Sequence, residues 1–294
     1  MTTPGAPRPS AAVLRAFRVS GHVPEQLPGG RGTTWRVGDV VLRPAGDVRE
    51  AQWRSDVLAC LPHTVAFRTP RPVAASGGGR DRSGRSGDRV GDRWVVDGWE
   101  AWERLEGAPD PTRVEDVVRA GTAFHRAVAG LARPSFLDRV DDPWSRAERL
   151  VWADGPAGDD RLPDDPLVRR LTAAFRPVQG RSQVVHRDLL GNVLFAAGRP
   201  PAVFDWAPTW RPAGFGAAVA VVDAVCWHGT PPARLAALGT LAEAPGWPQL
   251  LVRALAFRIV TLHVLGGWDA EQHARHRPVV DALLSGSAGT LDVP

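Results

Sequence analysis

The chain has 294 residues, of which 44% are apolar and 23% are charged, and its formal net charge is +4. This balance is typical of a globular protein, and the length suits one large domain or two packed lobes. Cys60 and Cys226 are the only cysteines, so the sequence excludes a fold stapled by several disulfides.

The basic residues are all arginine, because none of the 36 is a lysine. Almost nothing titrates between histidine and arginine, so a sequence pI near 10.5 overstates how basic the chain is. Affinity for nucleic acid follows clustered charge and not pI. The composition therefore gives no reason to expect a nucleic-acid partner. Lysine and tyrosine, both absent, have AT-rich codons, which indicates a high-GC bacterial gene.

The N-terminal residues, MTTPGAPRPSAAVLRAF, lack the continuous apolar core of a signal peptide. No window of about 18 residues is free of charge and apolar throughout, which excludes a membrane-spanning helix. Together with the low cysteine content, this predicts a cytoplasmic protein with no membrane partner. The sequence carries no signal for an oligomeric state.

The N-terminal part of the chain alternates short apolar runs with helical patterns. We expect helices at 11–17 and 49–61 and strands at 33–38, 39–44, 67–74 and 93–102. The segment 76–93 consists of Gly, Arg, Asp and Ser with a single Val, so it is predicted to be a flexible insertion. An Arg-Gly tract can bind RNA, but the alternating Asp residues cancel much of its charge.

The rest of the chain is mostly helical in pattern. Apolar residues recur at helical spacing over 111–131, with Pro111 near the start, and again over 231–244 and 247–268. Between these helices, VVHRDLLGNVLF at 184–195 is typical of a strand, a polar turn and a second strand.

Two interpretations of this polar turn are open. A plain hairpin would use Asn192 for a left-handed backbone conformation, whereas a catalytic loop would use its side chain. Asn192 is the only asparagine of the chain, and Asp188 lies four residues before it, which favours the catalytic loop. We expect His186 to pack and hydrogen-bond structurally.

A further carboxylate, Asp205, follows the next apolar strand in PPAVFDWAP. The order of strand, HRD turn, strand and Asp is typical of a phosphoryl-transfer site. Such a site needs an oriented acceptor hydroxyl and a divalent metal ion on the polyphosphate. We expect Asp188 to orient or deprotonate the hydroxyl, and Asn192 and Asp205 to bind Mg²⁺ through hard oxygen atoms.

These motifs resemble those of the aminoglycoside phosphotransferase and choline-kinase-like family, which shares the protein-kinase fold. HRDLLGNVLF followed by VFDW is similar to its catalytic loop and metal-binding Asp. AGTAFHRAVAGL at 120–131, WERLEG at 102–107 and LPGGRGTTWRVGDVVLRP at 27–44 are similar to its Leu-His helix, its hinge, and its glycine-rich turn with the third strand. The resemblance covers most of residues 25–230.

The resemblance implies a two-lobed α+β fold, with a small β-rich N-lobe at 1–107 and a mostly helical C-lobe at 108–294. It implies ATP or GTP as the phosphoryl donor, Mg²⁺ as a cofactor, and a small-molecule hydroxyl as the acceptor. Asp223 falls where the family has an Asp that supports the catalytic loop. The implied nucleotide-binding residues are Gly29, Gly30, Gly32, Arg43, Glu50, Glu103 and Leu105.

Parts of this assignment have alternatives. The three glycines also suit a plain hairpin turn, and Asp56 is an alternative to Glu50 as the acidic partner of Arg43. Arg43 stands where the family has a lysine, and the longer, planar guanidinium is not a conservative replacement. The four-residue spacing of Asp188 and Asn192 is one shorter than in most members. A nucleotide-binding pseudokinase or scaffold is therefore the alternative to an active kinase.

The acceptor itself is not specified by the family resemblance. A polycationic aminoglycoside favours an acidic pocket, but the predicted C-terminal helices carry more arginines than acids. These arginines are Arg253, Arg258, Arg275 and Arg277. The sequence therefore predicts a phosphotransferase that acts on an alcohol group, without predicting antibiotic resistance.

Overall fold

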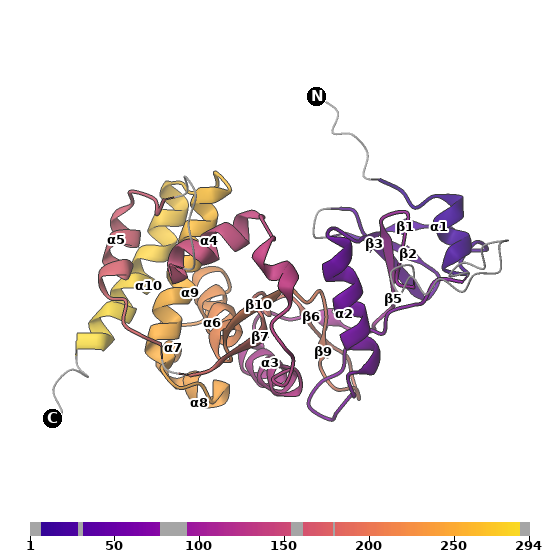
Figure 1. The fold of residues 1–294 in the computed structure, drawn as a ribbon. Helices are drawn as coiled ribbons and strands as arrows, with labels where there is room; N and C mark the ends of the chain where they lie inside the picture. The colour runs from indigo at the N-terminus through magenta and orange to yellow at the C-terminus, as the bar shows by residue number, and fades with distance from the viewer. Residues whose placement is uncertain (1–6, 29–31, 77–92, 154–160, 179, 289–294) are drawn as a thin grey trace. The chain divides into compact units, whose positions relative to one another are not determined.

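Figure 1 shows a computed structural model of the chain, which describes residues 7–28, 32–76, 93–153, 161–178 and 180–288. The chain divides into two compact units. Unit 1 comprises Met1–Thr64 and Arg68–Glu106, and unit 2 comprises Val65–Phe67 and Gly107–Pro294. Most of the predicted insertion at 76–93 lies outside the described residues.

Unit 1 is built on a five-stranded antiparallel sheet with the order β1-β2-β3-β5-β4. Its strands are β1 Glu25–Gln26, β2 Trp35–Val37, β3 Val40–Pro44, β4 Val95–Val96 and β5 Trp99–Glu103. Two-residue turns join β2 to β3 and β4 to β5. Gly38, Asp97 and Gly98 in these turns have φ values of 63°, 47° and 76°. Positive φ values are those that tight hairpins need.

Two helices complete unit 1, α1 Ala11–Ala16 and α2 Val48–Cys60. Val13 and Phe17, in and just after α1, pack into an apolar core with Leu42 and Trp99 of the sheet. Helix α2 begins after Asp47, whose side chain accepts hydrogen bonds from two backbone N–H groups of the first turn. Both helices lie close to their predicted ranges.

The predicted strand at 67–74 does not form as a continuous strand, because this segment makes isolated bridges, among them one between Pro72 and Trp102. The Val73 N–H also donates to the Ala101 carbonyl at 2.8 Å. The Glu103 N–H in turn donates to the Arg71 carbonyl at 2.8 Å, so the segment lies along β5 here without forming a longer ladder.

Unit 2 contains two small antiparallel sheets. Strands β7 Ser182–His186 and β10 Pro208–Pro212 form one. Strands β6 Ala108–Pro109, β8 Val193–Phe195 and β9 Ala202–Val203 form the other, in the order β6-β8-β9. Because β7 and β8 belong to different sheets, the polar turn between them is not a hairpin.

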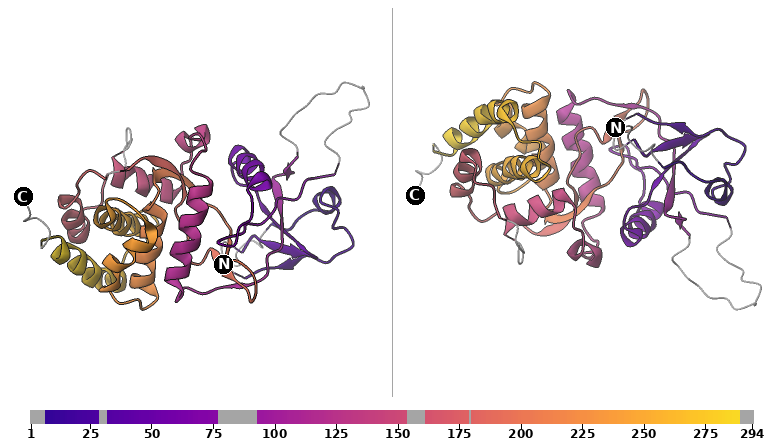
Figure 2. Two further views of the ribbon diagram at one scale, coloured as in Figure 1. Left: turned by 90° about the horizontal axis from the view of Figure 1, so that it is seen from below. Right: turned by 90° about the horizontal axis from the view of Figure 1, so that it is seen from above.

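In unit 2, α9 is buried along most of its length and several helices pack against it (Figures 1 and 2). Helices α4, α5, α6 and α10 all contact it. The helices are α3 Val114–Ala127, α4 Pro143–Trp152, α5 Pro166–Ala173, α6 Phe215–Trp227, α7 Arg234–Ala237, α8 Gly239–Ala242, α9 Trp247–Val264 and α10 Ala270–Ala288, with a 3-10 helix at Ser135–Asp138. Within the described ranges, no helix has the length and hydropathy needed to cross a bilayer.

Two of the helices differ in extent from the predicted ones. The pattern over 231–244 is divided into α7 and α8 just before Gly239, where an added Cβ would lie 2.4 Å from Trp247 Cδ1. The pattern over 247–268 ends at Val264, since Gly266 has a φ of 70°, which stops the helix.

Candidate active site

The loop between β7 and β8 is fixed by apolar anchors. Leu189 has no exposed surface, and Leu190 is buried. Leu189 packs against Gly121 of α3, where an added Cβ would lie 2.4 Å from Leu189 Cδ1. The close approach of α3 therefore requires glycine, and the packing sets where the polar residues of the loop lie.

His186 begins the loop as a fully buried, neutral imidazole. Its Nδ1 accepts a hydrogen bond from the Asp188 N–H at 3.1 Å, and its Nε2 lies 3.1 Å from the Phe204 carbonyl oxygen. A backbone N–H only donates and a carbonyl only accepts, so the proton must sit on Nε2. Burial lowers the pKa of His186, in keeping with this neutral form. The ring braces the loop and does not face a reacting group.

A second buried histidine, His125 of α3, supports the first. Its Nε2 accepts a hydrogen bond from the His186 N–H at 2.8 Å. Burial, together with the neighbouring His186, lowers the pKa of His125 to about 3. Both histidines are therefore structural parts of the loop support.

Asp188 is the most exposed charged group of the loop, with 46% of its side chain accessible to solvent. Arg258 Nη2 donates to its Oδ1 at 2.7 Å, and Asn192 Nδ2 donates to its Oδ2 at 3.2 Å. Both carboxylate oxygens are thus held in place while the group stays open to solvent. This is the arrangement expected of a positioned general base.

Arg258, on α9, links Asp188 to Asp223 of α6. Its Nε donates to Asp223 Oδ1 at 2.7 Å, and its Nη2 also donates to Asp223 Oδ2, so the pair is bidentate. Burial opposes the charge on Arg258, but the two carboxylates outweigh it and raise the pKa of the guanidinium. Burial raises the pKa of Asp223, and Arg258 opposes that rise. Asp223 thus supports the loop indirectly, through Arg258.

Asn192 and Asp205 lie at the same end of the β8–β9 pair, because the Asn192 carbonyl accepts a hydrogen bond from the Phe204 N–H at 3.1 Å. The Asn192 Nδ2 donates to the Asp188 carbonyl at 2.8 Å, so the amide nitrogen faces the loop. Asp205 is exposed and has a φ of 47°, a left-handed conformation that often marks functional positions.

The oxygen atoms of this pair fit a magnesium ion. One carboxylate and one amide oxygen are hard ligands, and Mg²⁺ usually takes its other ligands from water and from substrate phosphates. In the described part of the chain, no three His, Cys, Asp or Glu side chains come together as a complete metal site. The donor set therefore suits a metal that arrives with a nucleotide.

Arg187, the middle residue of the HRD motif, ties the loop to α4. Its Nη1 donates to Ser145 Oγ at 3.0 Å, and its Nη2 lies 3.3 Å from Asp142 Oδ2. It also lies 3.6 Å from Glu148 Oε2. Arg187 and Asp188 therefore engage different partners, Arg187 on α4 and Asp188 on α9.

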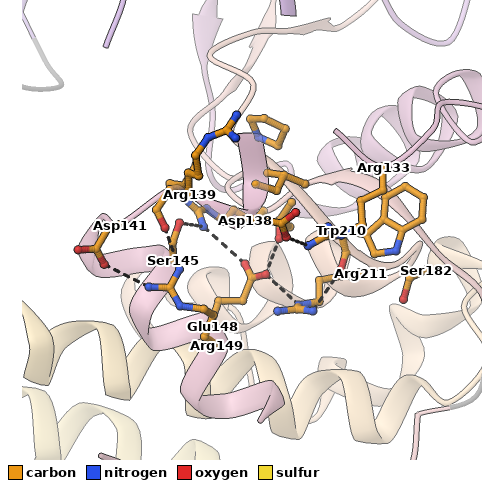
Figure 3. A pocket seen from close by; sticks show the side chains of 15 residues that line it. Arg133, Asp138, Arg139, Asp141, Ser145, Glu148, Arg149, Ser182, Trp210 and Arg211 are labelled. Carbon is orange, nitrogen blue, oxygen red and sulfur yellow. Dashed lines mark hydrogen bonds and ion pairs between the residues drawn. The ribbon is translucent and has the colours of Figure 1, made fainter. Parts of the chain in front are cut away.

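Arg187 and two of its partners, Ser145 and Glu148, line a cavity of about 750 Å³ in unit 2 (Figure 3). Figure 3 shows Glu148 facing Arg211, with 2.8 Å between Oε1 and the guanidinium Nε, and Asp141 paired with Arg149 at 3.2 Å. Arg133 pairs with Asp138 in the same cavity. Each of these arginines already has a carboxylate partner within the cavity. We therefore assign the residues of this cavity a structural role, in holding the loop that carries Arg187.

Arg43 of unit 1 belongs to a chain of ion pairs. Its Nε lies 2.5 Å from Oε1 of Glu100, a residue of β5 with only 1% of its side chain exposed. Arg54 of α2 donates to the same Glu100 oxygen at 2.9 Å and to Glu50 Oε1 at 2.8 Å. The structure thus brings Arg43 and Glu50 into one network, with Glu100 at its centre. Asp56 instead accepts a hydrogen bond from the Trp94 indole at 2.6 Å.

The structure describes only some of the other predicted nucleotide-binding residues. Gly29 and Gly30 lie outside the described residues. Gly32 has a φ of 65°, and its carbonyl accepts a hydrogen bond from Gln26 Nε2 at 2.6 Å. Glu103 ends β5 and is exposed, and Leu105 follows in the connection as a half-buried residue.

The sequence reasoning did not assign a role to Arg258 or Glu100. Each is a charged residue within an apolar run, LVRALAFRIV and WEAWE. A buried charge needs a partner of opposite sign, and that requirement is the signal that could have singled them out.

Comparison with known proteins assigns the family. The sequence matches the model of the phosphotransferase enzyme family, APH, over residues 25–251. The chain belongs to this family. A search of the curated proteins found no match. The family resemblance and the prediction of a phosphotransferase are therefore confirmed.

Members of the same fold are found among solved structures. The apo form of a thermostable mutant of aminoglycoside phosphotransferase APH(4)-Ia is 15% identical, with a TM-score of 0.55 over 94% of this chain and 100% of that chain. Choline kinase LicA from Streptococcus pneumoniae is 11% identical, with a TM-score of 0.51 over 90% and 93% of the two chains. The microcompartment-associated aminopropanol kinase is 14% identical, with a TM-score of 0.52 over 90% of each. These likenesses confirm the predicted kinase-like α+β fold.

Proposed function

We propose that this phosphotransferase is an ATP- or GTP-dependent kinase that transfers the γ-phosphoryl group to a hydroxyl of a small molecule. The observation that carries the proposal is Asp188, which Arg258 and Asn192 hold by both oxygens while it stays open to solvent. The solved neighbours add support, since they include a hygromycin B complex with ADP, a choline kinase and an aminopropanol kinase.

Asp188 accepts the proton of the acceptor hydroxyl. As the hydroxyl oxygen forms its bond to the γ-phosphorus, the bond from phosphorus to the bridging oxygen breaks and the nucleoside diphosphate leaves. The proton then passes from the carboxylate to solvent. Arg258 keeps the carboxylate in one orientation, so little reorganisation is needed at the moment of transfer.

Asn192 Oδ1 and the Asp205 carboxylate would hold Mg²⁺. When bound, the ion neutralises charge on the polyphosphate and fixes its orientation. The hydrogen bond from Asn192 Nδ2 to the Asp188 carbonyl couples the proposed metal ligand to the proposed base. The four-residue spacing of this loop therefore still lets the two side chains contact each other.

We assign nucleotide binding to residues 1–107 and catalysis to residues 108–294. In this assignment Arg43 binds the phosphates with the help of Glu50, and Gly29, Gly30 and Gly32 let backbone N–H groups approach them. The backbone around Glu103 and Leu105 binds the base. Cys60 and Cys226 are both free thiols, which suits a cytoplasmic enzyme.

The test is phosphoryl transfer from Mg-ATP to a panel of small alcohols, followed by nucleoside diphosphate release and by mass of the product. Asp188→Asn should lower kcat by about 10²–10⁴-fold, the range for loss of a general base. Asp281→Asn, which removes a carboxylate paired with Arg170 in the same unit, is the matched control. Thermal stabilisation by nucleotide with no transfer to any acceptor would instead support the pseudokinase.

A further inference from the structure

A second cavity of unit 2 lies at the C-terminal ends of α6 and α9, with a volume of about 210 Å³. Two buried residues, Asp223 and Arg258, are part of its lining. Arg258 donates to Asp188 Oδ1 at 2.7 Å, so the cavity lies one side chain away from the proposed base. An acceptor held here would have its hydroxyl near the carboxylate that takes the proton.

The walls of this cavity are mainly apolar. Trp144 of α4 and Trp227 at the end of α6 contribute two indoles, and Leu262 and Leu265 contribute aliphatic side chains. Leu265 is 49% exposed, although leucine is usually buried. An exposed leucine at the rim of a cavity suits contact with an apolar ligand.

The charges that line the cavity are already paired. Among the described residues that line it, Asp223 is the only carboxylate and Arg258 the only guanidinium, and both Asp223 oxygens accept hydrogen bonds from Arg258. The carboxylate in the described lining already pairs with Arg258, so a ligand with several ammonium groups would lose water there without gaining an unpaired carboxylate for each charge. Burying an unpaired charge is costly, so the cavity selects against such a ligand.

We propose that this cavity is the acceptor site and that it takes an uncharged alcohol with a compact aromatic or alicyclic body. The inference rests on the proposed function, and it narrows the acceptor class. The volume corresponds to roughly seven water molecules at the density of the liquid. This suits the reacting end of a single-ring alcohol better than a polycationic aminoglycoside.

Binding can be measured without turnover, by calorimetry on the full chain with three probes. They are 2-phenylethanol, choline and hygromycin B. We expect 2-phenylethanol to bind at least about tenfold more tightly than either cationic probe, equivalent to about 1.4 kcal/mol. Equal or tighter binding of choline or hygromycin B would overturn the inference.

A charge placed at the rim gives a sharper test. Leu265→Glu should weaken binding of 2-phenylethanol by about tenfold and strengthen binding of its 4-aminomethyl derivative, which carries an ammonium group. Leu162→Glu makes the same change at a leucine that is 39% exposed and lies outside the cavity lining. If both variants shift the two affinities alike, the cavity is not the acceptor site.

Transfer assays with the same probes separate this inference from the proposed function. Transfer to hygromycin B with none to 2-phenylethanol supports the kinase and overturns the acceptor class. Selective binding of 2-phenylethanol that Leu265→Glu reverses, with no transfer to any acceptor, supports the cavity assignment and counts against the kinase.

Discussion

The two units each contain a buried network of charged side chains, and the two networks are opposite in sign. In unit 1 the carboxylate of Glu100 lies between two guanidinium groups, those of Arg43 and Arg54. In unit 2 the guanidinium of Arg258 lies between two carboxylates, those of Asp188 and Asp223. Each set of three thus has a buried centre, one buried partner and one outer member, and in unit 1 the buried partner Arg54 also pairs with Glu50.

The outer members show what the difference means for function. Arg43 is 21% exposed and presents a cation, while Asp188 is 46% exposed and presents a carboxylate. A cation suits phosphate oxygens, and a carboxylate suits the proton of a hydroxyl. In both units a buried counter-charge thus orients a more exposed group. In the proposed reaction, one such group would bind the nucleotide phosphates and the other would bind the acceptor hydroxyl.

Removing the centre of the unit 2 network should have the largest effect. Arg258→Met leaves Asp223 buried without its only hydrogen-bond partner in the described residues, so the free energy of unfolding should fall by about 3–5 kcal/mol. Denaturant titration measures this. The loss should shrink at low pH, where a protonated Asp223 needs no cation. Arg119→Met, at an exposed ion pair, should have little effect. Equal losses in the two variants would contradict the network.

The equivalent substitution in unit 1 should lower the free energy of unfolding by a smaller amount. Arg54→Met removes one of two cations from Glu100, but Arg43 remains, so a loss of about 1.5–3 kcal/mol is expected. Arg36→Met, at an exposed pair with Glu25, is the control for denaturant titration. A loss as large as that of Arg258→Met would show that Arg43 does not share the charge of Glu100.

Buried histidines should make unit 2 sensitive to pH. The pKa of His125 falls from its usual 6.5 to about 3 on folding, so below pH 6.5 the unfolded chain binds a proton that the folded chain does not. Stability therefore decreases as the pH falls, by about 2 kcal/mol from pH 7 to pH 5 for this group. His125→Gln keeps an acceptor for the His186 N–H and should show a correspondingly smaller decrease. An unchanged pH dependence would argue against a neutral His125.

The outer cation should affect nucleotide binding more than stability. Arg43→Gln should raise the KM for ATP by about tenfold, equivalent to about 1.4 kcal/mol, because one charged contact to phosphate is lost. Steady-state kinetics at saturating acceptor measures this. Arg49→Gln, an exposed arginine of α2, is the control. If Arg43→Gln changes only the unfolding transition, Arg43 is a structural residue.

The fold was predictable where local pattern decides it. The turn at Gly38 follows from its residue type, and α2 follows from its apolar spacing. The prediction of one strand over 93–102 was wrong, because the positive φ values of Asp97 and Gly98 form a turn that divides this segment into β4 and β5. The partner of β7 was not predictable. This strand pairs with β10, on the far side of β8 and β9 in sequence, and strand periodicity does not encode which strand is the partner.

In the candidate site, too, the local motif was predictable from the sequence and the long-range contacts were not. The order of Asp188, Asn192 and Asp205 along the chain predicted a phosphoryl-transfer loop, because the motif is local. The partners of Asp188 and Arg43 come from elsewhere in the chain. Arg258 follows Asp188 by 70 residues, and Glu100 follows Arg43 by 57, so only the folded chain shows that they meet.

Arg43 also determines which chemical reagents can probe the nucleotide site. Acylating probes and acetyl donors react with the ε-amine of lysine, and this chain contains no lysine. A guanidinium stays protonated and is a poor nucleophile. Amine-directed labels carried by nucleotide analogues should therefore find no side-chain amine to modify, and the side chains offer no target for regulation by lysine acetylation.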